Sequence, residues 1–291
     1  MKIHFAKMHG LGNDFILVDC RQIKLNNLSE ISKRLCHRRF GIGADQMIFF
    51  YDSTRADFKM KIFNADGSEV EMCGNGIRCL AKYIWDRNLS DKNILYIETL
   101  AGIIKPEKVG EMVKVDMGKP IFEPQKIPVK IGDQSNPPST KGKLGRIIDY
   151  PLNVDDKVFN ITCVSMGNPH AIIVVEDLSH FPVVYYGPIV ETLSQFPKKT
   201  NVEFIEILNP SEIKMRVWER GVGETMACGT GASAGAVASN VKGLTEKTVT
   251  VHLLGGDLLI EWAEEDHVYM TGPAVEVFEG VIENLGRYIY P

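Results

Sequence analysis

A Cys-Gly-x-Gly sequence occurs twice in this chain of 291 residues, at 73–76 and at 228–231. Where a loop turns into a helix, glycines leave backbone N–H groups free to bind an anion, and the positive end of the helix dipole attracts a carboxylate. The same field lowers the pKa of a thiol. If two such thiols face each other across a cleft, one can take a proton from a carbon atom while the other delivers a proton to its opposite face. The pattern indicates racemisation or epimerisation at a carbon next to a carboxylate.

Both motifs belong to an internal repeat. Cys228 follows Cys73 by 155 residues, and the same spacing aligns 59–64 with 214–219. It also aligns polar residues outside the motifs, namely Asn13 with Asn168, Gln46 with Asn201, and Asn64 with Glu219. One half therefore has an amide where the other has a carboxylate followed by Arg220, as a substrate with two chemically distinct ends requires. We interpret the chain as two homologous halves that each contribute one thiol to a ligand cleft.

The repeat also places the domain boundaries. We predict a first domain at 1–122 and a second at 123–274, which begins with a linker region at 123–156. This region is rich in proline, glycine and lysine and is predicted to be loop around one or two strands. The tail at 275–291 has no counterpart at the end of the first half, and we expect it to pack back on the first domain.

Each half is predicted to be α+β, with more strand than helix. The most secure helices follow the two motifs, at 77–85 and 232–239. The first is apolar on most faces and the second consists almost entirely of small residues, and both patterns are typical of a buried helix. Short apolar or alternating segments bounded by turn residues predict the strands. These are expected at 15–18, 47–51, 59–63, 94–97 and 113–115, and at 171–175, 203–207, 215–218, 248–252 and 258–262.

The composition excludes several classes of function. Against 37 Asp and Glu there are 33 Lys and Arg, and a net charge of −4 argues against nucleic-acid binding. No apolar run is long enough for a signal peptide or a membrane span, so we expect a cytoplasmic protein with reduced thiols. No cysteine pair has zinc-like spacing, and no metal is predicted. Four of the six cysteines lack a repeated glycine setting and are interpreted as packed hydrophobic residues, namely Cys20, Cys36, Cys79 and Cys163.

A set of six segments gives a specific resemblance that covers nearly the whole chain. They are Met8–Phe15, Asn64–Cys79, Gly167–His170, Thr200–Phe204, Trp218–Gly221 and Ala227–Gly231. In order and spacing they resemble diaminopimelate epimerase. The resemblance implies a two-base epimerase without a cofactor, which interconverts LL- and meso-diaminopimelate in lysine and peptidoglycan synthesis. It also implies two pseudo-symmetric domains, each a mostly antiparallel β-barrel wrapped around a central helix, and a cytoplasmic homodimer.

The resemblance further implies roles for individual residues. Cys73 and Cys228 would be the catalytic pair, one a thiolate and one a thiol, which exchange roles with the direction of reaction. His170 and Glu219 match positions that tune the pKa values of the cysteines, and Tyr269 resembles a position tied to dimer formation. The reacting carboxylate would be bound by backbone N–H groups of Gly74, Asn75, Gly229 and Thr230. The other expected substrate contacts are Asn13, Gln46, Asn64, Asn168, Asn201, Glu219 and Arg220.

Four alternatives stay open at this point. A proline or hydroxyproline racemase of the same fold would use the same two thiols, but such enzymes typically have His where this chain has Asn75. Their one-ended substrate also has less need of Arg220, whose planar fork can bind both oxygens of a distal carboxylate. A phenazine-biosynthesis-like isomerase lacks the cysteine pair. A thiol–disulfide redox protein would join Cys73 and Cys228 reversibly, and a binding protein without turnover would not need a second activated thiol.

Overall fold

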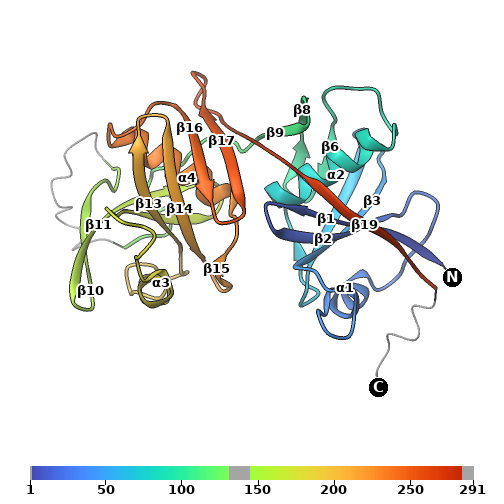
Figure 1. The fold of residues 1–291 in the computed structure, drawn as a ribbon, viewed down its shortest axis with the longest axis horizontal. Helices are drawn as coiled ribbons and strands as arrows, with labels where there is room; N and C mark the ends of the chain where they lie inside the picture. Colours follow the sequence, from blue (N-terminus) through green and yellow to red (C-terminus); the bar gives the residue numbers. More distant parts are fainter. Residues whose placement is uncertain (1, 131–144, 284–291) are drawn as a thin grey trace. The chain divides into compact units, whose positions relative to one another are not determined.

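The computed structural model describes residues 2–130 and 145–283, and the chain divides into two compact units (Figure 1). The first unit comprises Met1–Asp116 and Thr271–Pro291, as far as these ranges are described, and the second comprises Met117–Met270. The boundaries expected from the sequence, after residues 122 and 274, lie six and four residues beyond these divisions. Residues 131–144 of the predicted linker and 284–291 of the tail lie outside the described residues.

The first unit is organised around a sheet with the strand order β19-β1-β2-β3-β4-β6-β7, in which β5 pairs with β4. Most neighbours are antiparallel, whereas β2 with β3 and β4 with β6 are parallel. Strands β8 and β9 pair as an antiparallel hairpin. The strands are β1 (Ile3–Gly10), β2 (Asn13–Asp19), β3 (Gln46–Asp52), β4 (Phe58–Asn64), β5 (Glu69–Val70), β6 (Ile97–Thr99), β7 (Gly102–Ile104), β8 (Glu107–Val109), β9 (Met112–Asp116) and β19 (Val275–Ile282). Because β19 pairs antiparallel with β1, the described part of the tail completes this sheet.

The second unit repeats the plan with the strand order β10-β11-β12-β13-β14-β16-β17-β18, in which β15 pairs with β14. Here β12 with β13 and β14 with β16 are the parallel neighbours. These two parallel pairs occupy the same positions in the strand order as the pairs β2–β3 and β4–β6 of the first unit, as expected for a duplicated fold. The strands are β10 (Tyr150–Val154), β11 (Lys157–Ser165), β12 (Pro169–Val174), β13 (Asn201–Asn209), β14 (Glu212–Glu219), β15 (Gly223–Thr225), β16 (Thr248–Leu253), β17 (Gly256–Trp262) and β18 (Val268–Gly272).

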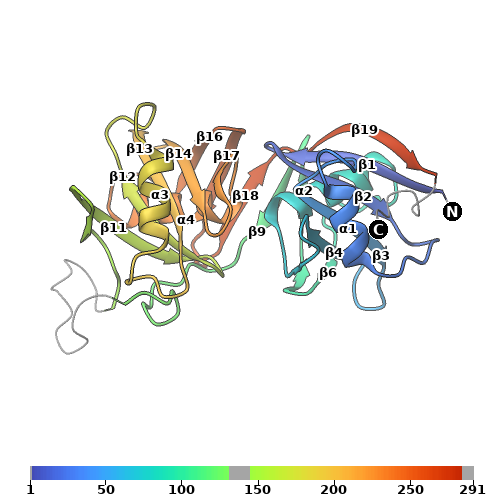
Figure 2. The same cartoon turned by 90° about the horizontal axis from the view of Figure 1, so that it is seen from below.

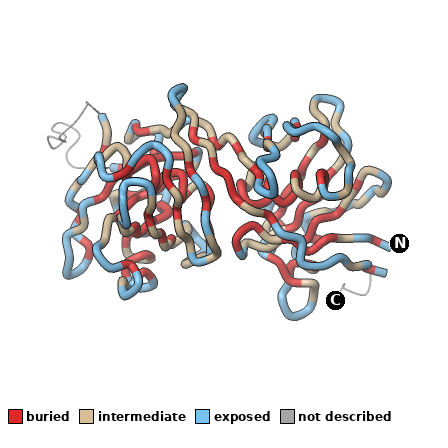
Figure 3. Tube along the Cα trace, turned by 45° about the horizontal axis from the view of Figure 1, so that its top comes forward, coloured by how far each residue is buried: buried red, intermediate tan, exposed pale blue. Residues whose placement is uncertain are grey.

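A buried helix lies against the sheet of each unit. Helix α2 (Gly74–Asp86) packs against β1, β2, β3, β9 and β19, and its residues from Gly74 to Ala81 are all buried. Helix α4 (Gly229–Val241) packs against β11, β12, β13, β14, β16 and β17, and its small side chains allow this close approach. Figure 2 labels the two helices within their units, and the red segments in Figure 3 show that each unit has a buried interior. This arrangement confirms the α+β fold class, and α2 and α4 contain the two predicted helices.

Two further helices and one strand boundary were not predicted correctly. Helices α1 (Leu28–Cys36) and α3 (Val183–Glu191) lie in segments for which no helix was predicted. The strand expected at 94–97 is wrong, because β6 begins only at Ile97. Tyr96 is held instead by the turn at Asp57, whose carboxylate accepts a hydrogen bond from the Tyr96 N–H at 2.9 Å. Within the described residues, no helix is long and apolar enough to cross a membrane.

Candidate active site

The two motif cysteines occupy the same structural position in their units, the residue immediately before a buried helix. Cys73 precedes α2 with φ −137° and ψ 119°, and Cys228 precedes α4 with φ −126° and ψ 113°. In both cases the next two residues supply the first N–H groups of the helix, which have no acceptor within the helix. The repeat therefore builds two similar half-sites, each with a thiol beside anion-binding N–H groups.

In the first half-site, Asn13 connects the thiol to the helix. Its Oδ1 lies 3.8 Å from the Cys73 Sγ and accepts a hydrogen bond from Asn75 Nδ2 at 3.2 Å. On its other side, Asn13 Nδ2 donates to Asp45 Oδ2 at 2.9 Å. Because Asp45 accepts from the amide nitrogen, the amide oxygen of Asn13 faces the thiol.

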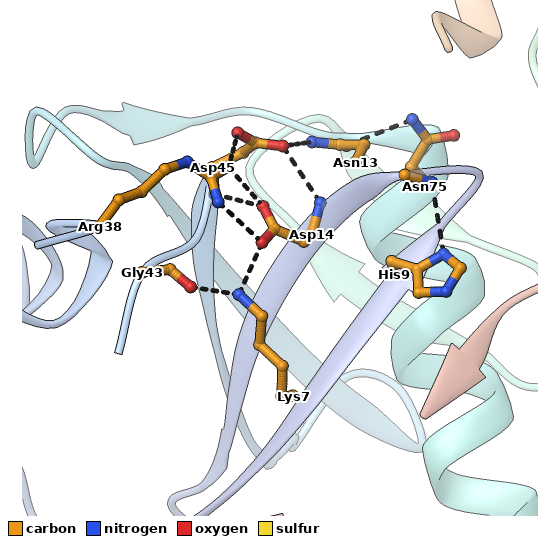
Figure 4. A network of polar contacts seen from close by, with 9 residues as sticks. Lys7, His9, Asn13, Asp14, Arg38, Gly43, Asp45 and Asn75 are labelled. Atoms are coloured by element: carbon orange, nitrogen blue, oxygen red, sulfur yellow. Dashed lines mark hydrogen bonds and ion pairs between the residues drawn. The ribbon is translucent and has the colours of Figure 1, made fainter. Parts of the chain in front are cut away.

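A charged network holds Asp45 and Asn13 in place (Figure 4). Arg38 bridges Asp45 and Asp14 with N···O distances of 2.6 and 2.9 Å, and Lys7 contacts Asp14 at 2.7 Å. Burial acts to raise the pKa of Asp14, but the hydrogen bonds from Arg38 and Lys7 outweigh it and hold this pKa well below its usual range. Asp14 is therefore a fixed anion at the start of β2, next to Asn13.

Gln46 and Asn64 form a second pair in the first unit. They lie opposite each other in the β3–β4 ladder, and Gln46 Nε2 donates to Asn64 Oδ1 at 2.8 Å. Asn64 in turn donates to Ser68 Oγ at 2.9 Å. The other amide oxygen, Gln46 Oε1, is buried without a hydrogen-bond partner in the structure. It is an acceptor that an ammonium group of a ligand could satisfy.

In the second half-site the thiol lies against the first turn of its own helix. Cys228 Sγ accepts a hydrogen bond from the Gly231 N–H at 3.4 Å and lies 3.5 Å from Thr230 Oγ1. Thr230 Oγ1 also accepts from Asn168 Nδ2 at 3.3 Å. Asn168, the counterpart of Asn13, therefore contacts helix α4 through the Thr230 side chain.

Asn168 is held by a buried histidine and carboxylate rather than by an exposed ion network. His170 Nε2 lies 2.9 Å from Asn168 Oδ1, and His170 Nδ1 lies 2.7 Å from Glu203 Oε1. The His170 and Glu203 side chains are completely buried. Glu203 also lies at the start of α4, because a Cβ placed on Gly231 would lie only 2.8 Å from Glu203 Oε1.

Sequence reasoning missed Glu203 as a site residue, although its segment was part of the resemblance. The available signal was a carboxylate in the centre of an apolar strand, since Glu203 lies between Val202 and Phe204 in β13. Arg78, a charged residue on the predicted buried helix α2, was missed in the same way and is also completely buried. A charged residue within an apolar segment is therefore the pattern that could have identified both.

Glu219 lies close enough to Cys228 to influence it. Its carboxylate accepts a hydrogen bond from Thr225 Oγ1. Burial raises the pKa of Glu219, although hydrogen bonds from Thr225 and Cys228 oppose the shift. Burial also raises the pKa of the Cys228 thiol well above its usual value, and repulsion from Glu219 and Glu203 adds to this effect.

The turn after β14 is held by two side chains, one of which was expected to contact substrate. Asn201 Oδ1 accepts from the Arg220 N–H at 2.9 Å, and Asn201 Nδ2 donates to the Pro169 carbonyl at 2.8 Å. Glu191 accepts from the Gly221 N–H at 2.9 Å. In this structure Asn201 therefore positions the backbone of Arg220, whose own side chain is exposed.

With this geometry established, comparison with known proteins decides the family. The family model of diaminopimelate epimerase matches residues 5–123 and 162–277. The diaminopimelate epimerase of Acetivibrio thermocellus is 50% identical over 287 residues, which cover 97% of this chain and 99% of that protein. That of Methanococcus maripaludis strain C5 is 52% identical over 285 residues, covering 96% and 99%. This chain belongs to the diaminopimelate epimerase family.

More distant solved structures share the fold of this family member. A PhzF-family phenazine biosynthesis protein of Bacillus anthracis aligns with a TM-score of 0.71 at 20% identity, covering 97% of this chain and 99% of that chain. A hydroxyproline epimerase of Agrobacterium vitis aligns with a TM-score of 0.65 at 12% identity, covering 97% and 92%. At these identities the likeness concerns the fold alone.

The remaining cysteines of this diaminopimelate epimerase family member lie in the interior of their units. Cys20, Cys36, Cys79 and Cys163 are all buried. Burial raises the pKa of the first three thiols to about 12 and raises that of Cys163 further. None of these four thiols is therefore ionised near neutral pH.

Two further expectations concern the rest of the chain. Tyr269, which was predicted to take part in dimer formation, donates its hydroxyl to Glu265 Oε1 at 3.1 Å and stacks on His267. Its role in dimer formation stays a prediction. In the described ranges, no group of three or more His, Cys, Asp or Glu side chains is arranged to hold a metal ion.

Proposed function

We propose that this chain is a two-base epimerase that interconverts LL- and meso-diaminopimelate with Cys73 and Cys228 as its acid–base pair. Membership of the diaminopimelate epimerase family supports the reaction. The observation that carries the mechanism is the equivalent position of the two thiols, each directly before a buried helix with nearly the same backbone angles. One thiolate removes the α-proton and the other cysteine, as a thiol, returns a proton to the opposite face.

Binding of the reacting end is assigned to the two helix N-termini. Backbone N–H groups of Gly74, Asn75, Gly229 and Thr230 would bind the α-carboxylate, where negative charge accumulates when the α-proton is removed. The proposed mechanism uses no cofactor, because these N–H donors would stabilise the charge. Asn13 and Asn168 support the two helix N-termini, since each forms a hydrogen bond with a side chain in the first turn of its helix.

The distal end of the substrate carries a second carboxylate and a second ammonium group. The exposed side chain of Arg220 would bind that carboxylate with its planar fork, and Glu219 would accept from the ammonium. Gln46 and Asn64 would supply neutral acceptors from the first unit, with Gln46 Oε1 still unpaired in the structure. In this proposal Asn201 acts by holding the backbone of Arg220. His170 and Glu219 adjust the pKa values of the cysteine thiols.

The assembly and location of the enzyme are also proposals. We propose a homodimer, with Tyr269 at or near its interface, that works in the cytoplasm, as the sequence resemblance implies. Size-exclusion chromatography with light scattering would test the dimer. A Tyr269→Ala variant that stays dimeric would show that the Tyr269 side chain is not required for dimer formation.

A proline or hydroxyproline racemase is the second candidate. The hydroxyproline epimerase of Agrobacterium vitis shares this fold, but at 12% identity the likeness concerns the fold and not the reaction. The purified, reduced protein should convert LL-diaminopimelate to the meso isomer without added cofactor and should not racemise proline. Turnover of proline or hydroxyproline alone would move the assignment to the second candidate, and turnover of neither would contradict both.

A further inference from the structure

The two half-sites differ in the sign of the charge that is buried beside the cysteine. In the first unit, Arg78 lies just over one helical turn after Cys73 and is completely buried. Its Nη1 donates to the Gly74 carbonyl at 3.4 Å, and its Nε donates to the Pro273 carbonyl at 3.2 Å. Because Gly74 directly follows Cys73, the guanidinium is fixed against the backbone that carries the thiol.

Burial lowers the pKa of Arg78, and the negative charges of ionised Cys79 and Cys73 oppose that shift. Burial raises the pKa of Cys79 to about 12, so that thiol stays neutral near neutral pH. Cys73 is only half-buried and sits at the N-terminus of α2, where the helix dipole also favours a negative charge. A guanidinium stays protonated inside a protein, and a buried charge is stabilised by an opposite charge nearby. Both effects favour the thiolate of Cys73.

Two acidic groups on the far side of Asn13, Asp14 and Asp45, do not oppose this arrangement. Asp14 and Asp45 form ion pairs with Arg38, and Asp14 also pairs with Lys7. His9, from β1, lies near the start of α2 in Figure 4. The negative charges on the far side of Asn13 are therefore balanced by their own cations.

The second half-site has the opposite charge. The residue 155 positions after Arg78 is Ser233, which is uncharged and donates its hydroxyl to the Gly229 carbonyl at 2.9 Å. The charged groups around Cys228 come from three strands, with Glu219 from β14, Glu203 from β13, and His170 bonded to Glu203 from β12. Burial, together with repulsion from Glu219 and Glu203, raises the pKa of the Cys228 thiol and so favours its protonated form.

We propose that Arg78 is a positioning residue that holds Cys73 as the thiolate in the resting enzyme, while Cys228 rests as the thiol. The catalytic meaning of this assignment rests on the proposed function, since it makes Cys73 the base and Cys228 the acid in the substrate-free protein. Arg78 is completely buried, so it acts through Cys73 and the backbone of Gly74 rather than on the substrate.

The test measures thiolate formation at each cysteine without substrate. The reduced protein is alkylated with iodoacetamide over a pH series, and peptides carrying Cys73 and Cys228 are quantified by mass spectrometry. Since only the thiolate reacts, the pH midpoint of the rate reports ionisation, whereas accessibility changes the plateau alone. In the wild-type protein the Cys73 midpoint should lie below that of Cys228, and the reverse order would overturn the proposal.

Variants then test the role of Arg78. Arg78→Met should raise the Cys73 midpoint by about one pH unit or more and leave that of Cys228 unchanged. Arg78→Lys should keep the Cys73 midpoint close to wild type, and Ser233→Ala is the matched control on α4. An unchanged Cys73 midpoint in a folded Arg78→Met protein, checked by circular dichroism, would overturn the proposal. Should that variant not fold, Arg78→Gln takes its place, and the wild-type order still decides the resting states.

This experiment is independent of the proposed function. Alkylation midpoints in the expected order, together with no turnover of diaminopimelate, would contradict the epimerase assignment and leave the charge assignment standing. Turnover with the midpoints reversed would contradict only the role given to Arg78.

Discussion

The two half-sites share a backbone and differ in the side chains that support it. Asn13 and Asn168 are equivalent by sequence, yet Asn13 is held by Asp45 in a partly exposed ion network, whereas Asn168 is held by the buried His170–Glu203 pair. Duplication therefore conserves the placement of a thiol at a helix N-terminus, while the surroundings diverge. The difference fits a reaction in which one cysteine starts as base and the other as acid on a substrate with two unlike ends.

The largest expected effect comes from removing either thiol. Cys73→Ala and Cys228→Ala should each lower kcat for epimerisation by about 10³-fold or more, because each reaction direction needs both an acid and a base. Steady-state assays with both diaminopimelate isomers measure this. Cys79→Ala, on the same helix as Cys73, is the matched control and should retain most activity. A single thiol variant with activity near wild type would show that the half-sites are not both required.

The next largest effect concerns Arg220, a cation that has no counterpart in the first unit. Arg220 aligns with Ala65 in the repeat, so Arg220→Ala makes the two halves alike at this position. Loss of a charge-assisted pair of hydrogen bonds should lower kcat/KM for diaminopimelate by about 10- to 100-fold. Lys198→Met, next to the same turn, should have little effect. Equal effects of the two changes would contradict a specific role for Arg220.

A smaller effect is expected from the support of Asn13. Asp45→Ala removes the acceptor for Asn13 Nδ2 and frees the amide to turn away from Cys73, which should lower kcat by about 10-fold. Thr200 occupies the equivalent position in the second unit, and its hydroxyl donates to the Asn201 carbonyl rather than holding Asn168. Kinetics of Thr200→Ala should therefore stay close to wild type. A larger loss in Thr200→Ala than in Asp45→Ala would contradict the different supports assigned to the two units.

The smallest effect is a pH dependence of stability in the first unit. Because the pKa of Asp14 is lowered in the folded protein, its ion pairs stabilise the fold above the pKa of an unfolded aspartate, about 4, and this stabilisation is lost as pH falls toward the folded value. Urea unfolding should show Asp14→Asn less stable than wild type at pH 7, with the difference shrinking below about pH 4. A difference that stays constant with pH would contradict this role of Asp14.

Much of the fold was predictable because duplication leaves a regular signal. The spacing of 155 residues predicted two similar units, and the apolar and small-residue patterns predicted buried helices within α2 and α4. Helix α3 was not predicted, since Pro188 lies inside it and its apolar residues show no clear helical period. Its place depends on tertiary contacts, including the one between Glu191 and Trp218.

The candidate site was predictable as a set of residues and less so as a set of contacts. The spacing identified Cys73 and Cys228, and the structure places each at the predicted helix N-terminus. Sequence alone could not show that Asn201 binds the backbone of Arg220, because that contact depends on how β13 pairs with β14. Glu203 was missed because a buried carboxylate is identified by its partners, and these lie on another strand.

The central claim is that two different groups act on opposite faces of one carbon. The most direct measurement is early-time epimerisation in D₂O, started from LL-diaminopimelate and, separately, from the meso isomer, with deuterium in substrate and product measured by mass spectrometry. The account predicts that the product gains one deuterium at the inverted carbon while the remaining substrate stays almost unlabelled, in both directions. Equal labelling of substrate and product would indicate a single base, and product without deuterium would show that no solvent-derived proton is delivered; either result would contradict the account.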